Sequence, residues 1–109
     1  MKKILFTLAL LISFSSFGQN DIKQGLVTEY YENGKIETIS NYVNGVKQGE
    51  EIGYFRSGKL SYKGIFVDGV INGEVIDYYE SGAVKDKVNF VDGIPGEFKN
   101  YKDGELIEN

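Results

Sequence analysis

The segment Gly49–Asn72 reads GEEIGYFRSGKLSYKGIFVDGVIN, and it decides the fold because its neighbours in the chain are versions of it. Residues 25–48 and 73–95 repeat the pattern, and residues 96–109 form a partial fourth copy. The positions that recur with a period of 24 residues are Gly25, Gly49 and Gly73; Tyr30, Tyr54 and Tyr78; Gly34, Gly58 and Gly82; Tyr42, Phe66 and Phe90; and Gly45, Gly69 and Gly93. A fixed period of this size predicts a repeat architecture in which each unit packs against the next.

Each repeat contains two turn signals with a central glycine. The first turns are Glu32–Lys35, Arg56–Lys59, Glu80–Ala83 and Lys102–Glu105, and the second turns are Val43–Val46, Val67–Val70 and Val91–Ile94. Asn-Gly or Asp-Gly between strand-forming residues is the strongest short-range hairpin signal, because a type I′ turn needs positive φ at both central residues. The sequence therefore predicts an all-β fold, a single-layer antiparallel meander of stacked β-hairpins with about seven or eight strands.

Two-residue turns would fix which residues lie opposite one another. The expected pairs at the first turns are Tyr31 with Ile36, Phe55 with Leu60, Tyr79 with Val84, and Tyr101 with Leu106. At the second turns, Val43 would lie opposite Val46 and Val67 opposite Val70. An aromatic-aliphatic pair in every copy stabilises the sheet and defines its register.

Side chains alternate between the two faces of a strand, so the repeat can be sorted into faces. We call one the core face; its expected members are Tyr31, Ile36, Tyr42, Phe55, Leu60, Phe66, Tyr79, Val84 and Phe90, together with Gly49 and Gly73. We call the other the second face; it carries Tyr30, Tyr54, Tyr78, Ile39, Ile52, Ile65 and Ile76 among Glu37, Asn41, Lys85 and Asn89.

No helical pattern follows residue 18, so nothing local is expected to cover the sheet. A single layer must then bend around its own core face or pack against a layer from elsewhere. A glycine in a strand either marks a bend or makes room for a large neighbour. Both interpretations fit the strand glycines Gly49, Gly53, Gly64 and Gly73.

The first 18 residues, MKKILFTLALLISFSSFG, have the order of a secretory signal peptide: two lysines, an apolar run and small residues before a cleavage site. The alternative, a transmembrane anchor, would need about 20 apolar residues, and this run is much shorter. We expect cleavage after Gly18, a polar lead-in at 19–24 and a repeat domain at 25–109. The protein is then exported, either to the periplasm or to the medium.

Composition excludes several classes of function. A formal charge of -4 argues against a nucleic-acid partner, because such sites carry a basic patch. The chain has no cysteine and no histidine, which removes disulfides, thiolate metal sites and the usual acid/base residue. Its carboxylates are interpreted as surface and turn residues, not as a catalytic pair or calcium loop. We expect no enzyme, no cofactor and no catalytic or metal-binding residue.

The second face supplies the candidate binding residues. Tyr30, Tyr54 and Tyr78 recur at one position, and Ile52 and Ile76 share their face. Tyrosine combines an apolar ring with a polar tip and is enriched at interfaces, although the same residues would also stabilise a sheet by cross-strand packing. The outer strands near Ile22–Tyr30 and at Glu105–Ile107 are expected to be unpaired, and unpaired edges recruit other strands.

The pattern Gly-x4-Tyr-Tyr/Phe-x2-Gly-x-Leu/Ile, followed by Tyr/Phe-Val-Asn/Asp-Gly, resembles the MORN repeats, especially the bacterial variant called YwqK-type antitoxins. The resemblance covers Gly25 to about Leu106 and implies stacked hairpins in a twisted, curved sheet. The chain lacks tryptophan, unlike the eukaryotic repeats to which phospholipid binding is attached. We expect an exported, non-enzymatic module that binds a protein partner of unknown identity through the aromatic face or an edge, with self-association into a homo-oligomer as a further option. The alternatives are an envelope module contacting lipid or polysaccharide, and a small carboxylate-dependent hydrolase.

Overall fold

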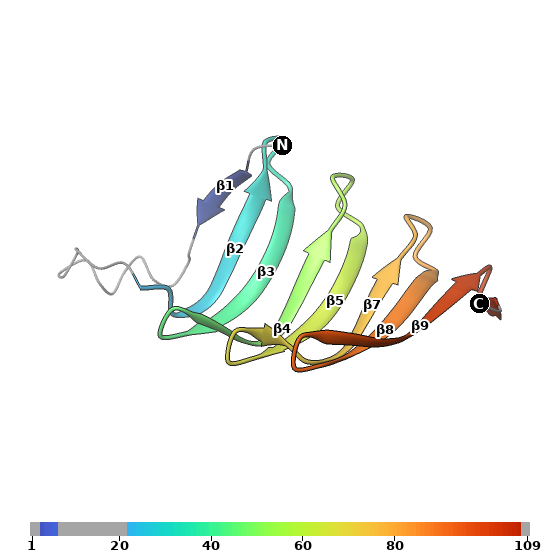
Figure 1. The fold of residues 1–109 in the computed structure, drawn as a ribbon. Helices are drawn as coiled ribbons and strands as arrows, with labels where there is room; N and C mark the ends of the chain where they lie inside the picture. The colour runs from blue at the N-terminus through green and yellow to red at the C-terminus, as the bar shows by residue number, and fades with distance from the viewer. Residues whose placement is uncertain (1–2, 7–21, 108–109) are drawn as a thin grey trace.

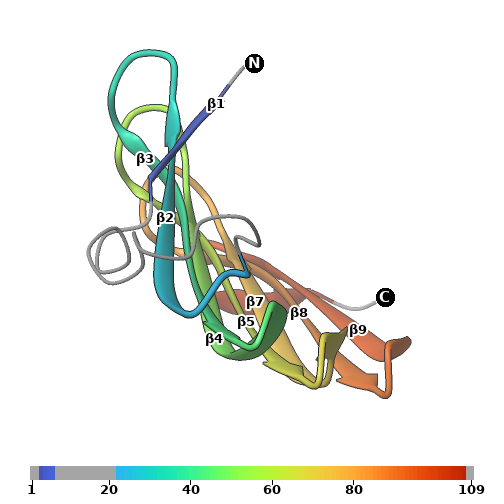
Figure 2. The ribbon, with the colours of Figure 1, turned by 90° about the vertical axis from the view of Figure 1, so that its left-hand side faces the viewer.

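The computed structural model describes residues 3–6 and 22–107, which form one antiparallel sheet in the order β1-β2-β3-β4-β5-β7-β8-β9-β10, with β6 paired to β5. The hairpins stand side by side in a single curved layer, and the view from the side shows how strongly the sheet bends and twists (Figures 1 and 2). The strands are β1 (Lys3–Phe6), β2 (Gly25–Tyr31), β3 (Ile36–Val43), β4 (Val46–Tyr54), β5 (Leu60–Val67), β6 (Val70–Ile71), β7 (Gly73–Tyr78), β8 (Val84–Val91), β9 (Ile94–Lys102) and β10 (Glu105–Ile107). The predicted all-β meander is confirmed.

The strand count agrees with the repeat pattern. β6 and β7 are two halves of one strand position, separated at Asn72. Residues 25–107 therefore supply eight strand positions, within the seven or eight expected.

The second turns have the predicted geometry. Both central residues have positive φ, from 50° at Asn44, Asp68 and Asp92 to between 83° and 84° at the glycine that follows. Val43 lies opposite Val46 and Val67 opposite Val70, as expected. Positive φ at both positions defines the type I′ turn, whose twist matches that of the flanking strands.

The first turns of the three full repeats differ from the prediction. Tyr30 lies opposite Ile36, Tyr54 opposite Leu60 and Tyr78 opposite Val84, so the pairs predicted for Tyr31, Phe55 and Tyr79 were wrong. Only the last turn, Lys102–Glu105, keeps its two-residue form and the Tyr101–Leu106 pair.

The reason lies in the residue before the glycine. In the first repeat the Gly34 N–H donates to the Tyr31 carbonyl at 2.9 Å and the Tyr31 N–H to the Lys35 carbonyl at 2.8 Å. Only the glycine has positive φ, which gives a three-residue loop followed by a bulge. Asn33, Ser57 and Ser81 each accept a hydrogen bond from the N–H two residues on, an arrangement that competes with the type I′ turn.

The changed register moves three residues between faces. Residues directly opposite one another project to the same face. Ile36, Leu60 and Val84 therefore accompany the second-face tyrosines near the loops, not the core face. Tyr42, Phe66 and Phe90 keep their predicted face, opposite the repeat-opening glycines Gly25, Gly49 and Gly73.

The strand glycines divide between the two interpretations. Gly49 and Gly73 have φ of 99° and 108°, and a Cβ added at either would meet no atom within 4 Å, so these two glycines bend the strand. Gly53 instead makes room, because a Cβ there would lie 2.0 Å from the Tyr62 ring. Gly64 is buried beside Ile71 and Val75.

The N-terminal edge is not open, contrary to expectation. β1 pairs with β2 from Lys3 opposite Tyr31 to Phe6 opposite Thr28. β1 lies inside the expected signal peptide, whose remaining residues fall outside the described part of the chain. The C-terminal strand β10 does form the other end of the sheet.

The core face holds a small and partly polar core. Among the described residues, five side chains are buried: Val27, Ser40, Glu51, Asp86 and Val88, at 2–9% exposure. They share one face through the register, in which Val27 faces Ser40 and Ser40 faces Glu51. The expected aromatic residues surround this centre and are half-buried, except Tyr79, which is exposed. A layer with no cover thus buries little besides the middle of each strand.

Gly53→Ala should destabilise the protein, because the new methyl group would displace the Tyr62 ring. We expect a loss of about 1–3 kcal/mol in the free energy of unfolding, the usual cost of overpacking. Chemical denaturation measures it. In the Tyr62→Ser background the same substitution should cost much less, and equal costs in both backgrounds would contradict the packing explanation.

Candidate functional site

The second face places the five candidate residues in two adjoining rows. Tyr30, Tyr54 and Tyr78 each lie opposite an aliphatic residue near the first turns, as described above. Ile52 lies between Ile39 and Lys63, and Ile76 between Lys63 and Lys87. All five are half-buried. The structure thus brings the candidates together on one face, where part of each side chain reaches solvent.

Tyr101 extends the tyrosine row, although it was not among the candidates predicted from the sequence. Lys99 lies opposite Lys87, and Tyr101, two residues further along β9, shares its face. The Lys87 Nζ lies 5.6 Å from the Tyr101 ring centroid. The signal was present, since Tyr101 follows Gly96 by five residues, as Tyr30, Tyr54 and Tyr78 follow their glycines. The second-face tyrosine row therefore consists of Tyr30, Tyr54, Tyr78 and Tyr101.

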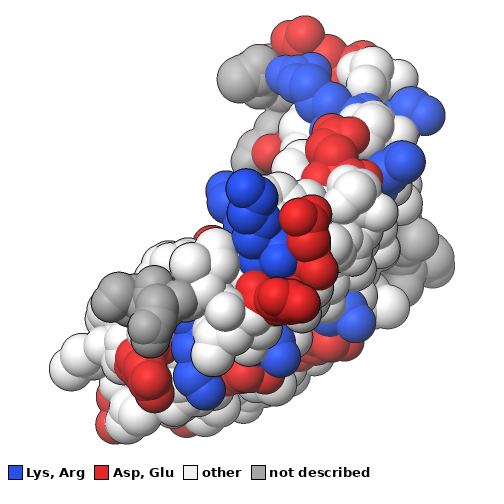
Figure 3. Space-filling model, turned by 90° about the vertical axis from the view of Figure 1, so that its right-hand side faces the viewer, with Lys and Arg blue, Asp and Glu red and all other residues white. Residues whose placement is uncertain are grey.

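A row of lysines runs beside these tyrosines toward the β9 end. The cross-strand register joins Lys63 to Ile76, Ile76 to Lys87 and Lys87 to Lys99. Within the described residues, none of the three lysines forms an ion pair; the pair that is formed joins Lys47 and Glu51 on the other face. The second face thus carries a row of three lysines without ion-pair partners among the described residues, although Glu50 and Glu74 project from the same face. Elsewhere at this end, acidic and basic side chains are interleaved without a large patch of one sign (Figure 3).

The core face carries a polar cluster around Glu51. Its carboxylate accepts hydrogen bonds from the Ser40 hydroxyl and the Lys47 ammonium, both at 2.7 Å. Tyr62 lies beside it, and burial, the charge of Glu51 and a hydrogen bond to Glu51 raise the pKa of the Tyr62 hydroxyl. A buried carboxylate with a cationic partner and neutral donors is a structural arrangement, since each group meets the others' hydrogen-bonding needs.

Two carboxyl groups meet directly on the same face. Asp77 lies opposite Asp86, which is 8% exposed, and the Oδ1 atom of Asp86 has no hydrogen-bond partner in the described residues. Burial raises the pKa of Asp77 from 3.8 to about 6, helped by a hydrogen bond to Asp86 and its charge, while Lys85 acts the other way. Two facing carboxylates cannot both ionise cheaply, so Asp77 keeps its proton to a higher pH than an exposed aspartate does.

This pair should make the protein less stable as the pH rises. Folding raises the pKa of the Asp77 carboxyl from 3.8 to about 6. Its contribution to stability is therefore fully present below pH 3.8 and is lost as the pH rises through about 6. Asp77→Asn should flatten the dependence between pH 4 and pH 7 and raise the free energy of unfolding at pH 7 by about 1 kcal/mol, discounted for partial exposure. Denaturation at several pH values checks this.

The matched control is Asp103→Asn, which changes an exposed turn residue that tolerates either side chain. It should keep the dependence of the unmodified protein. An unchanged pH dependence in Asp77→Asn would show that the carboxyl pair is not its source.

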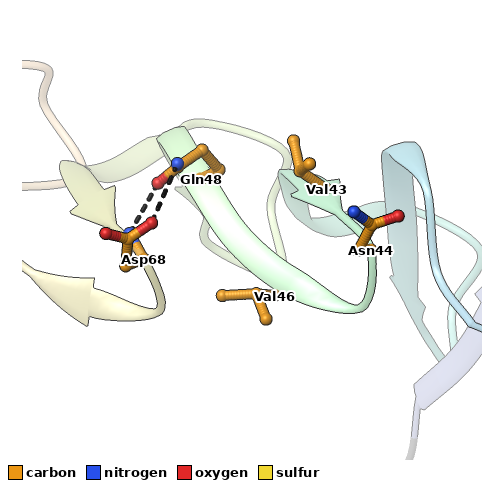
Figure 4. Close-up of a pocket in the computed structure, with 5 residues that line it drawn as sticks. All are labelled: Val43, Asn44, Val46, Gln48 and Asp68. Carbon is orange, nitrogen blue, oxygen red and sulfur yellow. Dashed lines mark hydrogen bonds between the residues drawn. The ribbon is translucent and has the colours of Figure 1, made fainter.

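The second turns line one edge of the sheet. The spacing of the repeats did not indicate that this edge is an exposed surface. A groove of about 350 Å³ between the first two of them is lined by Val43, Asn44, Val46, Gln48 and Asp68 (Figure 4). The Gln48 side chain connects β4 to the turn at Asp68. Its amide oxygen accepts a hydrogen bond from the Asp68 N–H at 2.5 Å, and its amide nitrogen donates one to the Asp68 carboxylate at 3.3 Å. Val43 and Val46 are 46% and 43% exposed. The signal was the aliphatic residue, valine or isoleucine, on each side of every second turn.

Neither a cluster of metal ligands nor a helix that could span a membrane is found in the described part of the chain. It contains no cluster of three or more potential metal-ligating side chains. Its residues also form no helix with the length and apolarity to span a bilayer.

Comparison with known proteins identifies the repeats. Residues 23–44, 47–68 and 71–92 each match the MORN repeat variant family, and together these segments cover more than half of the 109 residues. The matched units begin two residues before the predicted repeats and have the same spacing. None of the curated proteins compared with the chain matches it.

Proposed function

Because the chain belongs to the MORN repeat variant family, whose members are generally non-catalytic and often binding modules, we propose that it is an exported, non-enzymatic module that binds a protein partner. The observation that carries the proposal is the second-face tyrosine row, with Ile52 and Ile76 beside it. Partly exposed tyrosines next to aliphatic residues suit a protein interface, since the rings contribute contact area and the hydroxyls hydrogen bonds.

The lysine row indicates which chemical groups the partner should present. Lys63, Lys87 and Lys99 lie beside the tyrosines and lack acidic partners within the described residues. An interface is favoured when charges across it are complementary. We infer that the partner presents carboxylates opposite the lysines and apolar groups opposite the tyrosine row. The antitoxin role of the YwqK-type variant would be one instance of such binding, with a partner outside the cytoplasm.

Changing Tyr30, Tyr54 and Tyr78 together to Ser should abolish binding. The experiment is capture of the tagged protein from its native cells, followed by quantitative mass spectrometry of co-purifying proteins. We expect one stoichiometric partner, reduced at least tenfold in the triple variant, because removing three central aromatic contacts typically costs several kcal/mol.

The matched control changes Glu32, Arg56 and Glu80 to Ser, three repeat-equivalent residues in the exposed first turns. This control should retain the partner, and circular dichroism should show that both variants are folded. Full retention by a folded tyrosine variant would exclude the second face as the interface. Enrichment of lipid or glycan without protein would favour the envelope alternative.

Export should remove the first 18 residues, so the mature protein should begin at Gln19. Intact-mass spectrometry of the protein recovered from the periplasm or medium tests this. Processing would also remove β1, and the β2 amides that face it would then exchange faster with solvent. Hydrogen exchange at Thr28–Tyr31, compared between processed and unprocessed protein, measures that change, and a mature protein that retains residues 1–18 would contradict the proposal.

A further inference from the structure

Consecutive repeats join at the second turns by one contact that recurs three times. The glycine N–H of each second turn donates to a carbonyl of the preceding segment, from Gly45 to Lys23 at 2.8 Å, from Gly69 to Lys47 at 2.9 Å and from Gly93 to Ile71 at 2.9 Å. An aliphatic side chain next to each carbonyl lies against the same glycine; the three are Ile22, Val46 and Val70. This junction requires a carbonyl and an aliphatic residue on one side and an Asx-Gly turn on the other.

The strand that leads into each second turn also makes a recurring pairing with the strand before it. Its aromatic residue, two positions before Asn or Asp, lies opposite the glycine that opens the repeat: Tyr42 opposite Gly25, Phe66 opposite Gly49 and Phe90 opposite Gly73. The opening glycine has no side chain, so nothing on it obstructs the ring. We call this element, a strand ending in aromatic-Val-Asx-Gly, a return strand; β3, β5 and β8 are the three examples.

β9 offers part of this pattern on its outer edge without a return strand. Ile94 and Pro95 stand where Val70 and Ile71 stand one repeat earlier, and Gly96 is the fourth opening glycine in the sequence. Gly96 differs from the other three in having no positive φ, and a Cβ added to it would lie 2.9 Å from the Asn89 carbonyl oxygen. β10 pairs with β9 only over Asn100–Lys102, so within the described residues no strand covers the outer edge of Ile94–Lys99. Proline has no N–H, but the junction uses only its carbonyl.

The exposure of the side chains agrees with an uncovered junction. Ile94 is 68% exposed, against 43% and 44% for its equivalents Val46 and Val70, which contact the next glycine. Val91 is 59% exposed, against 46% and 45% for Val43 and Val67. The difference is confined to the last second turn.

We propose that the outer edge of β9, from Ile94 to Lys99, binds in trans a partner's return strand that ends in aromatic-Val-Asx-Gly. The incoming strand runs antiparallel to β9, and its turn glycine donates to the Pro95 carbonyl against Ile94. This inference rests on the proposed binding function and deepens it, but it uses the backbone edge of β9, which includes Lys99 of the lysine row, and not the side chains of Tyr30, Tyr54 and Tyr78.

One feature limits the affinity of this site. In the earlier junctions Gln24, Gln48 and Asn72 also hydrogen bond to the turn through their side chains. The fourth copy is one residue shorter at this point and has no such amide, since Gly96 follows Pro95 directly. Recognition therefore depends on strand pairing and on the Ile94 contact, which makes Ile94 the residue to test.

The probe is a synthetic peptide with the sequence of residues 60–70, LSYKGIFVDGV, which is the β5 return strand with its turn. It is titrated into the ¹⁵N-labelled full chain and followed by NMR and by anisotropy of a labelled copy. We expect shifts confined to Ile94–Lys99 and the adjoining turn. A peptide with Gly69→Val should bind at least tenfold more weakly, because a β-branched residue does not adopt the positive φ of the turn.

The protein variants are Ile94→Ser and its internal equivalent Val46→Ser, whose side chain already contacts Gly69. Ile94→Ser should weaken peptide binding at least tenfold and Val46→Ser should leave it unchanged. The triple tyrosine variant should still bind the peptide, so failure of the second-face proposal and failure of this one are distinguishable.

Three outcomes would overturn the proposal: no binding at millimolar peptide, shifts that map to β2 or to the second face, or equal binding by the Gly69→Val peptide. A dimer formed through β9, detected by light scattering and not dissociated by the peptide, would also overturn the proposal, because a second copy of the chain would then occupy the edge by another contact.

Discussion

The described residues form a sheet with no covering layer, so its stability must come from contacts between neighbouring strands, and this constraint shapes the whole molecule. In a two-layer protein the apolar face of a sheet is buried by helices or by a second sheet. Here, each hairpin is held mainly by the next one along the chain. The recurring hydrogen bond from a turn glycine to the preceding repeat, as from Gly69 to Lys47, is therefore part of the main stabilising framework, not a local detail. Such nearest-neighbour stabilisation is typical of repeat proteins.

The same constraint explains why polar groups occupy the core face. Curvature shields only the middle of each strand, and that strip is too narrow for a large apolar core. Glu51 is tolerated there because Ser40 and Lys47 satisfy its carboxylate. Within the described part of the chain, Asp77 and Asp86 have no such cation in hydrogen-bond contact, and burial, together with the hydrogen bond to Asp86 and its charge, raises the pKa of Asp77. The core face therefore combines stabilising packing with a carboxyl pair whose charge depends on pH.

The sequence predicted the elements well because their signals are local. Asx-Gly turns determined the second hairpins, and the period determined how many there are. The register at the first turns was wrong because it depends on whether Asn33, Ser57 or Ser81 bonds to its own loop, an energetic competition that spacing does not reveal. Placing Ile36, Leu60 and Val84 on the core face followed from that single error, since a register shift moves residues between faces.

The candidate site was predictable only where it repeats. Tyr30, Tyr54 and Tyr78 were found because equivalent positions mark one face, whereas β1 and the edge of β9 that no described strand covers have no counterpart inside the repeat. The ends of a repeat array are where its internal contacts lack a neighbour, so they differ from the middle even when the sequence is similar. Ile94 illustrates this, because it resembles Val46 and Val70 in type and position but is considerably more exposed. In this architecture, the local structure of a residue can be predicted from the residues at the same position in the other repeats. Whether the residue is available for binding depends on how far it lies from the end of the array.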